Sequence, residues 1–226
     1  MFIGHWAPAL IAAAHPKAPR LGTLFVAGQL VDFGFFGLML IGVEKMRVDP
    51  GISVMNPMDL YHMPYTHSLL GTAIWAAAFG AIIWLASRNR TGAMIGAAVV
   101  LSHWFLDLLV HVPDLTLWGS EPKLGLGLWN YPAIEIPLEL GLTFGALIFY
   151  MMRTRAVAGS ARLAVGLLAL LLLTVQVVNW FGPPPGEVNA AAALAVLGTY
   201  AVLCLVAMWV GATRMHNAIK GTVPFN

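Results

Sequence analysis

Charged side chains are scarce in this chain: Asp, Glu, Lys and Arg together make up 10% of its 226 residues. Soluble domains carry about 25% charged residues, so an ordinary soluble globule is excluded. Disorder is excluded as well, because a disordered chain combines low hydrophobicity with high charge, whereas apolar residues here reach 59% and the mean hydropathy is +0.80. A globule of this size has too little interior to bury so many apolar side chains. We therefore expect the chain in a lipid bilayer.

Basic clusters and cysteine pairs are also missing. The 12 Lys and Arg residues are scattered in ones and twos, as in the flanks of membrane helices, and they form no nucleic-acid-binding face. The single cysteine, Cys204, cannot form an intramolecular disulfide. No positive charge precedes the first apolar stretch, so we do not expect a cleaved signal peptide at the N-terminus. These absences leave membrane lipid, and not nucleic acid, as the expected partner.

Long apolar runs are what the chain has in abundance. A membrane-spanning helix needs about 20 mostly apolar residues. The windows of this kind are Thr23–Val43, Leu69–Ala86, Ala93–Val112, Ala133–Met152, Leu163–Phe181 and Ala190–Ala212. Prolines and glycines interrupt the connections, most densely in Gly182-Pro183-Pro184-Pro185-Gly186. The sequence predicts an all-α, polytopic membrane helical bundle with six transmembrane helices, folded as a single integral membrane domain over residues 1–226.

A shorter apolar stretch, Phe2–Ala14, precedes the first span. It is too short to cross a bilayer and lacks the charged face of an interfacial helix, so we predict a re-entrant half-helix inserted from the cytoplasmic side. Pro8 suits the first turn of a helix and His15-Pro16 its end. His5 would then lie at the buried tip. The unpaired backbone N–H groups of that tip must be covered by other spans or by a polar chamber.

Basic residues in the loops predict the orientation, because Lys and Arg favour the cytoplasmic side. With the N-terminus inside, the cytoplasmic segments hold Lys17, Arg20, Arg88, Arg90, Arg153, Arg155, Arg162, Arg214 and Lys220. The opposite side holds only Lys45, Arg47 and Lys123. We therefore expect a multi-pass protein of the cell (inner) membrane with both termini in the cytoplasm.

Ionisable residues inside the predicted spans are candidate functional residues, because each costs roughly 2.5–3.5 kcal/mol on the insertion scale. The first four spans and the mouth of the second contain Asp32, His67, His103, Asp107, His111, Glu135 and Glu139. The last two spans carry only Gln176 and Asn179. We therefore place the site in residues 1–152 and interpret residues 153–226 as two scaffold helices.

The third predicted span carries the most specific pattern. His103, Asp107 and His111 recur one helical turn apart, and Asp114 follows. At about 100° per residue the four share a stripe about 80° wide. Imidazole and carboxylate one turn apart suit a metal ion, whereas a single buried histidine is more simply explained by a bond to a neighbouring helix. Asp114 and His62 are candidates for a general base or a supporting partner, or else polar loop residues.

Depth along the helices brings the candidates together in the outer half of the membrane. At about 1.5 Å rise per residue, measured from the cytoplasmic basic residues, Asp32, His103, Glu139 and His5 all reach about 18–21 Å. Asp107 lies one turn higher, and His67 and His111 lie near the outer surface. A polar chamber open to the non-cytoplasmic side accommodates all of them.

Four segments follow one another in the chain: Gly4-His5, Asp32, Tyr65-Thr66-His67-Ser68 and Ser102-His103-Trp104-Phe105-Leu106-Asp107. Their order resembles that of the membrane-bound metal-dependent hydrolase family, also described as inner-membrane hydrolases. The resemblance covers about residues 4–145. The order Asp, His, His-x-x-x-Asp, His is also similar to the zinc-dependent phospholipase C and P1 nuclease group, helical proteins with a trinuclear zinc site that hydrolyse phosphodiesters. The resemblance thus implies bound zinc, about one to three ions, with manganese or iron as alternatives.

Carried over by motif, the resemblance implies particular ligands. It implies a principal metal site of Asp32, His67, His103 and Asp107, a further metal on His5 with bridging Asp107, and another on His111. The later His-x-x-x-Glu element of the soluble enzymes is missing, and Glu135 or Glu139 is the candidate substitute. Those enzymes also use a free N-terminal amine, for which Met1 is no evident match. A mononuclear or dinuclear site is therefore as consistent with the sequence as a trinuclear one.

The expected function is an integral membrane metal-dependent hydrolase in which a metal-activated water attacks a lipid or lipid-linked phosphoester. Asp107, His111 and Asp114 are its candidate catalytic residues. Two alternatives remain open: a proton or ion transporter with an Asp/His/Glu relay, and a haem protein with His67 and His103 or His111 as axial ligands. The substrate, the metal and the oligomeric state are left open by the sequence.

Overall fold

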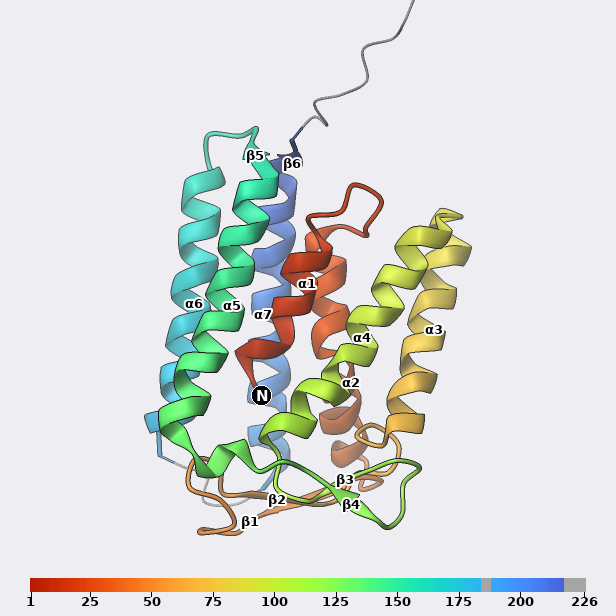
Figure 1. Cartoon of the computed structure of the whole chain (residues 1–226), viewed down its shortest axis with the longest axis vertical. Helices are drawn as coiled ribbons and strands as arrows, with labels where there is room; N and C mark the ends of the chain where they lie inside the picture. Colours follow the sequence, from red (N-terminus) through yellow and green to blue (C-terminus); the bar gives the residue numbers. More distant parts are fainter. Residues whose placement is uncertain (184–187, 218–226) are drawn as a thin grey trace, which may run out of the picture.

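A computed structural model describes residues 1–183 and 188–217 of the chain. Six helices are long and apolar enough to cross a membrane: α2 (Leu21–Leu40), α3 (Leu69–Ser87), α4 (Arg90–Val110), α5 (Pro132–Arg153), α6 (Ala161–Phe181) and α7 (Ala190–Ala212). Each overlaps one predicted window, so the predicted helical bundle is confirmed. The chain has the architecture of a multi-pass membrane protein (Figure 1).

Local sequence signals explain where several helices begin. The side chains of Ser68, Asn89 and Asn189 each accept a hydrogen bond from a backbone N–H in the first turn of α3, α4 and α7. Such caps satisfy amides that have no partner within the helix. Pro132 occupies the first position of α5, where its missing N–H costs nothing.

The N-terminal segment runs inside the bundle, between α2, α4 and α5, with the N-terminus toward the lower ends of the long helices in the view of Figure 1. It forms a 3₁₀ turn, η1 (Ile3–Trp6), followed by α1 (Ala7–Ala12). The predicted short helix is therefore present, but it ends at Ala12 and its first turn is 3₁₀. The residue at the buried tip is Met1, with His5 one turn further along, because two residues precede the 3₁₀ turn.

Small two-stranded sheets lie at the two ends of the bundle (Figure 1). At one end, β1 (Lys45–Val48) pairs with β2 (Met58–His62) and β3 (Leu115–Thr116) with β4 (Lys123–Leu124), beside the 3₁₀ turn η2 (Leu128–Asn130). At the other end, β5 (Thr154–Ala156) pairs with β6 (Arg214–His216). All three pairs are antiparallel.

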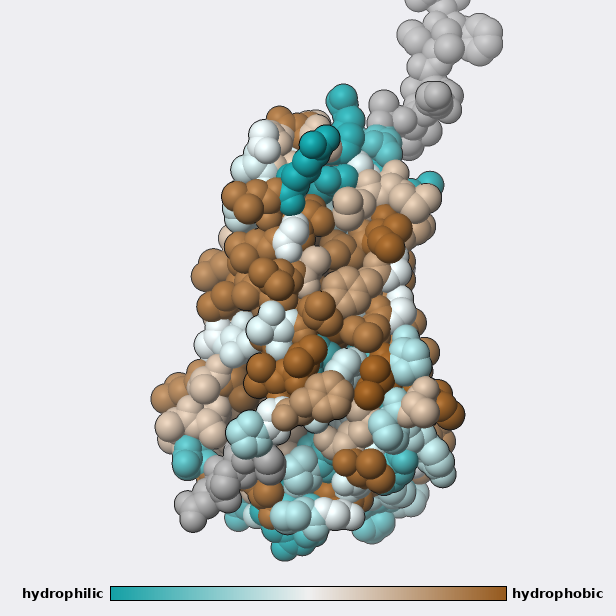
Figure 2. Space-filling view, turned by 90° about the vertical axis from the view of Figure 1, so that its left-hand side faces the viewer, coloured by the Kyte–Doolittle hydropathy of each residue, from teal (hydrophilic) through white to brown (hydrophobic). Residues whose placement is uncertain are grey.

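Basic residues divide between these two ends as the sequence predicted. The end with β5 and β6 carries the basic residues assigned to the cytoplasm, whereas Lys45, Arg47 and Lys123 belong to the hairpins of the opposite end (Figure 1). Lys220 and residues 184–186 of the proline-rich connection lie outside the described residues. An apolar band separates the two hydrophilic ends (Figure 2).

The main apolar core includes the N-terminal segment and the helices that pack around it. Trp6 and Leu10 of the N-terminal segment pack there with Phe25 of α2, Leu168 of α6 and Leu203 of α7. At Gly28 of α2 an added Cβ would lie 2.7 Å from the carbonyl oxygen of His5. Glycine at this position therefore allows α2 to approach the N-terminal segment closely.

Candidate metal centre

The carboxylate of Asp107 is the centre of a buried cluster of imidazoles. The Nε2 atoms of His5 and His111 lie 2.9 and 3.4 Å from its Oδ1. Those of His103 and His67 lie 3.1 and 3.6 Å from its Oδ2. Asp107 and His103 project from α4, His5 from η1, His67 from the loop before α3, and His111 from the end of α4. The fold thus gathers residues from three separate parts of the chain.

Asp32 of α2 extends the cluster. Its Oδ1 lies 3.2 Å from His67 Nε2 and 3.5 Å from His103 Nε2. Two groups of side chains, His5 with His103 and Asp107, and Asp32 with His67 and His103, each hold three ligand atoms within 4.8 Å of one another. His103 belongs to both groups. The residues predicted for the principal metal site, together with His5 and His111, therefore lie side by side.

Acceptors outside the cluster fix the orientation of two of these imidazoles. His103 Nδ1 lies 3.0 Å from the carbonyl oxygen of Gly28, and His111 Nδ1 lies 2.8 Å from Oδ1 of Asp114. A carbonyl or carboxylate oxygen only accepts, so each Nδ1 carries the hydrogen. The Nε2 atom of each ring is left facing Asp107. Metal-ligating histidines are typically held by such a bond on their other nitrogen.

His67 is oriented by a chain of hydrogen bonds. Its Nδ1 lies 2.8 Å from the Thr66 hydroxyl, which donates to Oε2 of Glu44 at 2.6 Å. Because the hydroxyl gives its own hydrogen to Glu44, it accepts from His67, and the Nε2 of His67 again faces the cluster. The other oxygen of Glu44 accepts from the backbone N–H groups of Tyr65 and Thr66. Sequence reasoning missed Glu44, because a lone carboxylate beyond a helix end has no pattern.

Three buried nitrogens, His5 Nδ1, His5 Nε2 and His103 Nε2, make no well-aligned hydrogen bond among the described residues, although both Nε2 atoms lie close to Asp107. His5 and His103 stack at 3.7 Å between ring centroids with an interplanar angle of 6°. Unpaired buried nitrogens are costly, and a cation beside Asp107 would pair with the Nε2 atoms of His5 and His103. Imidazole and carboxylate donors suit Zn²⁺, and carboxylate-rich sets also suit manganese or iron. The residues present therefore fit a divalent metal.

The α-amino group of Met1 also reaches the cluster, lying 2.8 Å from Oδ1 of Asp107. This corrects the sequence-based view that Met1 has no match to an N-terminal amine at the site. No pattern in the sequence marks it, because its position depends on how the N-terminal segment threads between the helices.

Glu139 of α5 takes a different position from the one expected of a ligand. Its Oε1 accepts hydrogen bonds from the backbone N–H groups of Phe2 and Gly4, and its Oε2 accepts one from Gln176 Nε2. Gln176 in turn accepts from the N–H of Ile3. Glu139 belongs to neither three-ligand group among the described residues. Its contacts satisfy the amides at the tip of the N-terminal segment, so we assign it the role of holding that segment in place.

The last two helices also contact the site, which changes the interpretation of residues 153–226 as scaffold. Gln176 of α6 binds Glu139, and the hydroxyl of Tyr200 in α7 lies 3.3 Å from Oδ2 of Asp32. Two other candidates lie apart from the cluster. Glu135 is buried in α5 and its oxygens have no partner in the described part of the chain. His62 is exposed on β2.

His111 and Asp114 form a pair at the outer end of α4, just beyond the spanning helix. Burial alone would lower the pKa of His111, but the carboxylates of Asp114 and Asp107 outweigh it and raise the pKa to about 9. The ring of Trp129 covers His111 at 4.3 Å between centroids. The arrangement holds a proton-carrying imidazole beside the cluster.

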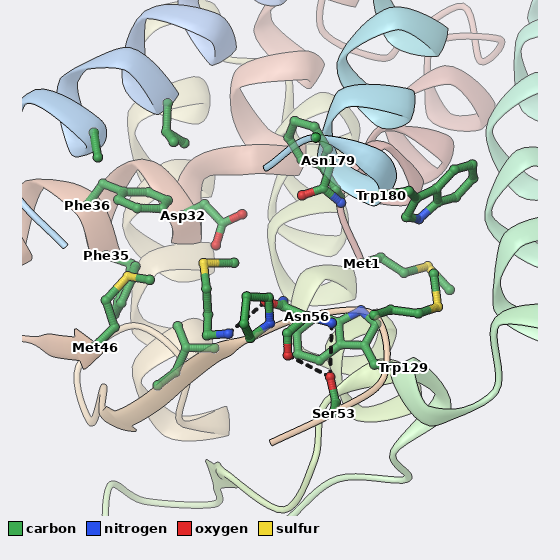
Figure 3. A pocket seen from close by; sticks show the side chains of 18 of the residues that line it. Met1, Asp32, Phe35, Phe36, Met46, Ser53, Asn56, Trp129, Asn179 and Trp180 are labelled. Carbon is green, nitrogen blue, oxygen red and sulfur yellow. Dashed lines mark hydrogen bonds between the residues drawn. The ribbon is translucent and has the colours of Figure 1, made fainter. Parts of the chain in front are cut away.

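A cavity of about 770 Å³ connects the cluster to the surroundings. Asp32, Asp107, His67, His111 and Glu139 line its inner end. Figure 3 shows the side chains of Asp32 and Asn179 pointing into it, with Ser53 and Asn56 of the β1–β2 loop on another side. The cavity lies at the end of the bundle where the sequence predicts a polar chamber, but apolar side chains form much of its lining.

No family model, curated protein or solved structure matches the chain. The functional argument therefore depends on the geometry of the site.

Proposed function

We propose that the protein is an integral membrane metal-dependent hydrolase, with Zn²⁺ as the first candidate metal. His5, Asp32, His67, His103 and Asp107 would hold the metal, in two overlapping groups that share His103. The single observation that carries the proposal is the convergence of four imidazole Nε2 atoms on the carboxylate of Asp107. His67 and His103 have their Nδ1 hydrogen bound elsewhere, which leaves Nε2 of both rings for a cation.

Each residue group has a defined task in this proposal. A bound zinc ion would lower the pKa of water toward about 7, which supplies a nucleophile at neutral pH. Asp107 belongs to the group with His5 and His103, and its Oδ2 also lies 3.6 Å from Nε2 of His67 in the second group. His111, with Nδ1 held by Asp114, presents Nε2 to the cavity side of the cluster and can donate a proton there and take it back. Glu139 and Glu44 position the N-terminal segment and His67.

The proposed substrate is a lipid or lipid-linked phosphoester. The cluster lies at the hairpin end of the apolar band, and its cavity is bordered by apolar side chains of α2, α6 and α7. A substrate with a polar head and an apolar part suits such a position. We also propose that the basic end of the bundle faces the cytoplasm of an inner membrane, because of the positive-inside rule. The hydrolytic site then opens on the opposite side.

Metal content and hydrolysis together test the proposal. Purified wild-type protein in detergent should contain zinc or another transition metal by elemental analysis and should hydrolyse bis(p-nitrophenyl) phosphate. His103→Gln and Asp107→Asn should lose both properties. His62→Ala is the matched control, because His62 is exposed on β2 and outside the cluster.

Two results would overturn the assignment. One is full metal occupancy in the doubly substituted protein. The other is proton or ion flux in proteoliposomes that disappears in Asp32→Asn, which would favour the transporter alternative. A haem absorption band would support the other alternative, a haem protein with histidine axial ligands.

A further inference from the structure

The cavity beside the cluster has two chemically different ends. Its inner end carries the carboxylates and imidazoles described above. Toward α2, α6 and α7 the walls become mainly apolar, with Phe36 and Met39 of α2, Val175 and Val178 of α6, and Val196 of α7. A ligand that fills this cavity must therefore be polar at one end and apolar at the other.

A second hollow, of about 390 Å³, continues the cavity between α6 and α7. It shares Val175, Ala195 and Thr199 with the cavity and extends along the helices to Leu171 and Val202. We call this hollow the α6–α7 groove; its lining is Leu171, Val175, Ala195, Gly198, Thr199, Val202 and Leu203.

Small residues keep the groove open. Ala195 has only a methyl group, and a Cβ added at Gly198 would meet nothing within 4 Å. Ala195, Gly198 and Val202 are exposed on the outer surface of the bundle. The groove therefore opens sideways, on a surface that is apolar along its length.

The direction of the groove follows from the chain. Counted from Ala190 at the hairpin end of α7, Ala195 and Val202 lie about 7 and 18 Å along the helix. The groove therefore runs from the level of the cavity toward the middle of the apolar band.

We propose that the substrate carries a hydrocarbon chain that lies in the α6–α7 groove while its polar head lies at the metal centre. This inference rests on the proposed function and adds the place where the hydrocarbon chain of the substrate lies and its route of access. A lipid head can reach a buried polar site only if its chain stays out of water, because each exposed methylene would lower occupancy about fourfold. A groove that is continuous with the lipid-facing surface meets that condition.

Photo-crosslinking tests where the chain lies. The probe is a phosphatidylglycerol with a diazirine in the middle of one acyl chain, incorporated into phosphatidylcholine nanodiscs with the wild-type protein. We expect label to concentrate in residues 171–175 and 195–203. Ala195→Trp places an indole in the groove and should reduce this label about fourfold or more. Leu194→Trp is the control, because Leu194 is 58% exposed on the same helix and does not line the groove.

The outcomes separate this inference from the proposed function. Label spread evenly over the lipid-facing surfaces of the six helices, or label unchanged by Ala195→Trp, would overturn the inference. Metal content measured on the same samples reports on the centre independently. Concentrated label in a protein that binds no metal would support the groove as a site for the hydrocarbon chain and would overturn the proposed hydrolase. Metal binding with evenly spread label would support the metal centre and overturn the groove as a chain site.

Discussion

The α-amino nitrogen of Met1 lies 2.8 Å from Oδ1 of Asp107, although 106 residues separate them. Both groups are almost completely buried, with 0% and 2% of their side-chain surfaces exposed. The same carboxylate oxygen lies 2.9 Å from His5 Nε2. Chain termini are usually poorly ordered unless other contacts hold them. Here the amine, the histidine and the carboxylate make the N-terminal segment a structural part of the candidate metal centre.

Residues added before Met1 should disrupt the centre. An extension converts the ammonium into an amide and must fit where Met1 is only 6% exposed. A buried carboxylate that loses a charged partner is strongly destabilised. We expect a Gly-Gly-Ser extension to reduce metal content and lower the melting temperature. The same three residues added after Asn226 are the control, and unchanged metal content in the N-terminally extended protein would contradict the role of the amine.

Removing the Glu139 carboxylate should release the N-terminal segment. It accepts from the N–H groups of Phe2 and Gly4, and hydrogen bonds to charged groups contribute roughly 1.5–3 kcal/mol each. Glu139→Ala should therefore raise the amide exchange rates of residues 2–4 and lower metal content. Glu139→Gln keeps an accepting oxygen and should preserve much of both. If Glu139→Ala lost metal with unchanged exchange, Glu139 would be a ligand instead.

Replacing Glu44 should weaken metal binding without touching a ligand. In Glu44→Gln the side-chain amide can donate to the Thr66 hydroxyl. The hydroxyl can then donate to His67 Nδ1 instead of accepting from it, so the tautomer of His67 with hydrogen on Nδ1 is no longer favoured. Substitution of such supporting partners typically costs about 10–100-fold in metal affinity. Competition with a fluorescent zinc chelator measures the change. Glu121→Gln, on an exposed loop, is the control, and equal affinities in both variants would argue against the proposed hydrogen-bond chain.

Asp114→Asn should separate a proton-transfer role of His111 from a ligand role. The amide can present either its oxygen or its NH₂ group to His111 Nδ1, so the ring orientation and tautomer are no longer fixed. General acid–base groups contribute about 10²–10⁴-fold to rate. We expect hydrolysis of bis(p-nitrophenyl) phosphate to fall about 100-fold with metal content unchanged. Loss of metal in proportion to activity would instead identify His111 as a ligand supported by Asp114.

Periodicity within single helices was sufficient to predict much of the site. Each spanning helix is determined by about 20 consecutive apolar residues, and the spacing of His103, Asp107 and His111 places them on one face of α4 whatever surrounds it. The rise per residue also placed Asp32 and His5 near the same depth. It placed His67 near the outer surface, which is wrong, because His67 Nε2 lies 3.2 Å from Oδ1 of Asp32. The predictions that succeeded depend only on local geometry.

Contacts between segments could not be predicted in this way. Glu44 is linked to His67 through Thr66 across a loop, and Glu139 meets the backbone of Phe2 across 137 residues of sequence. Neither residue has a repeating pattern that reveals its partner. Glu139 and Asp107 both carry a carboxylate at membrane depth, so their types alone do not distinguish a segment anchor from a metal ligand.

The sequence by itself thus determined the helices, the charged and apolar zones, and the face of α4 that carries ligands, because hydropathy and helical period act locally. Only the tertiary structure decided that the amine of Met1 joins Asp107, that Glu139 holds the N-terminal segment, and that α6 and α7 leave a groove at Ala195. These features depend on which segments become neighbours. The surfaces of the spanning helices are nearly equal in hydrophobicity, so hydrophobicity alone does not determine which helices pack together. Small residues and buried hydrogen bonds determine the helix arrangement instead.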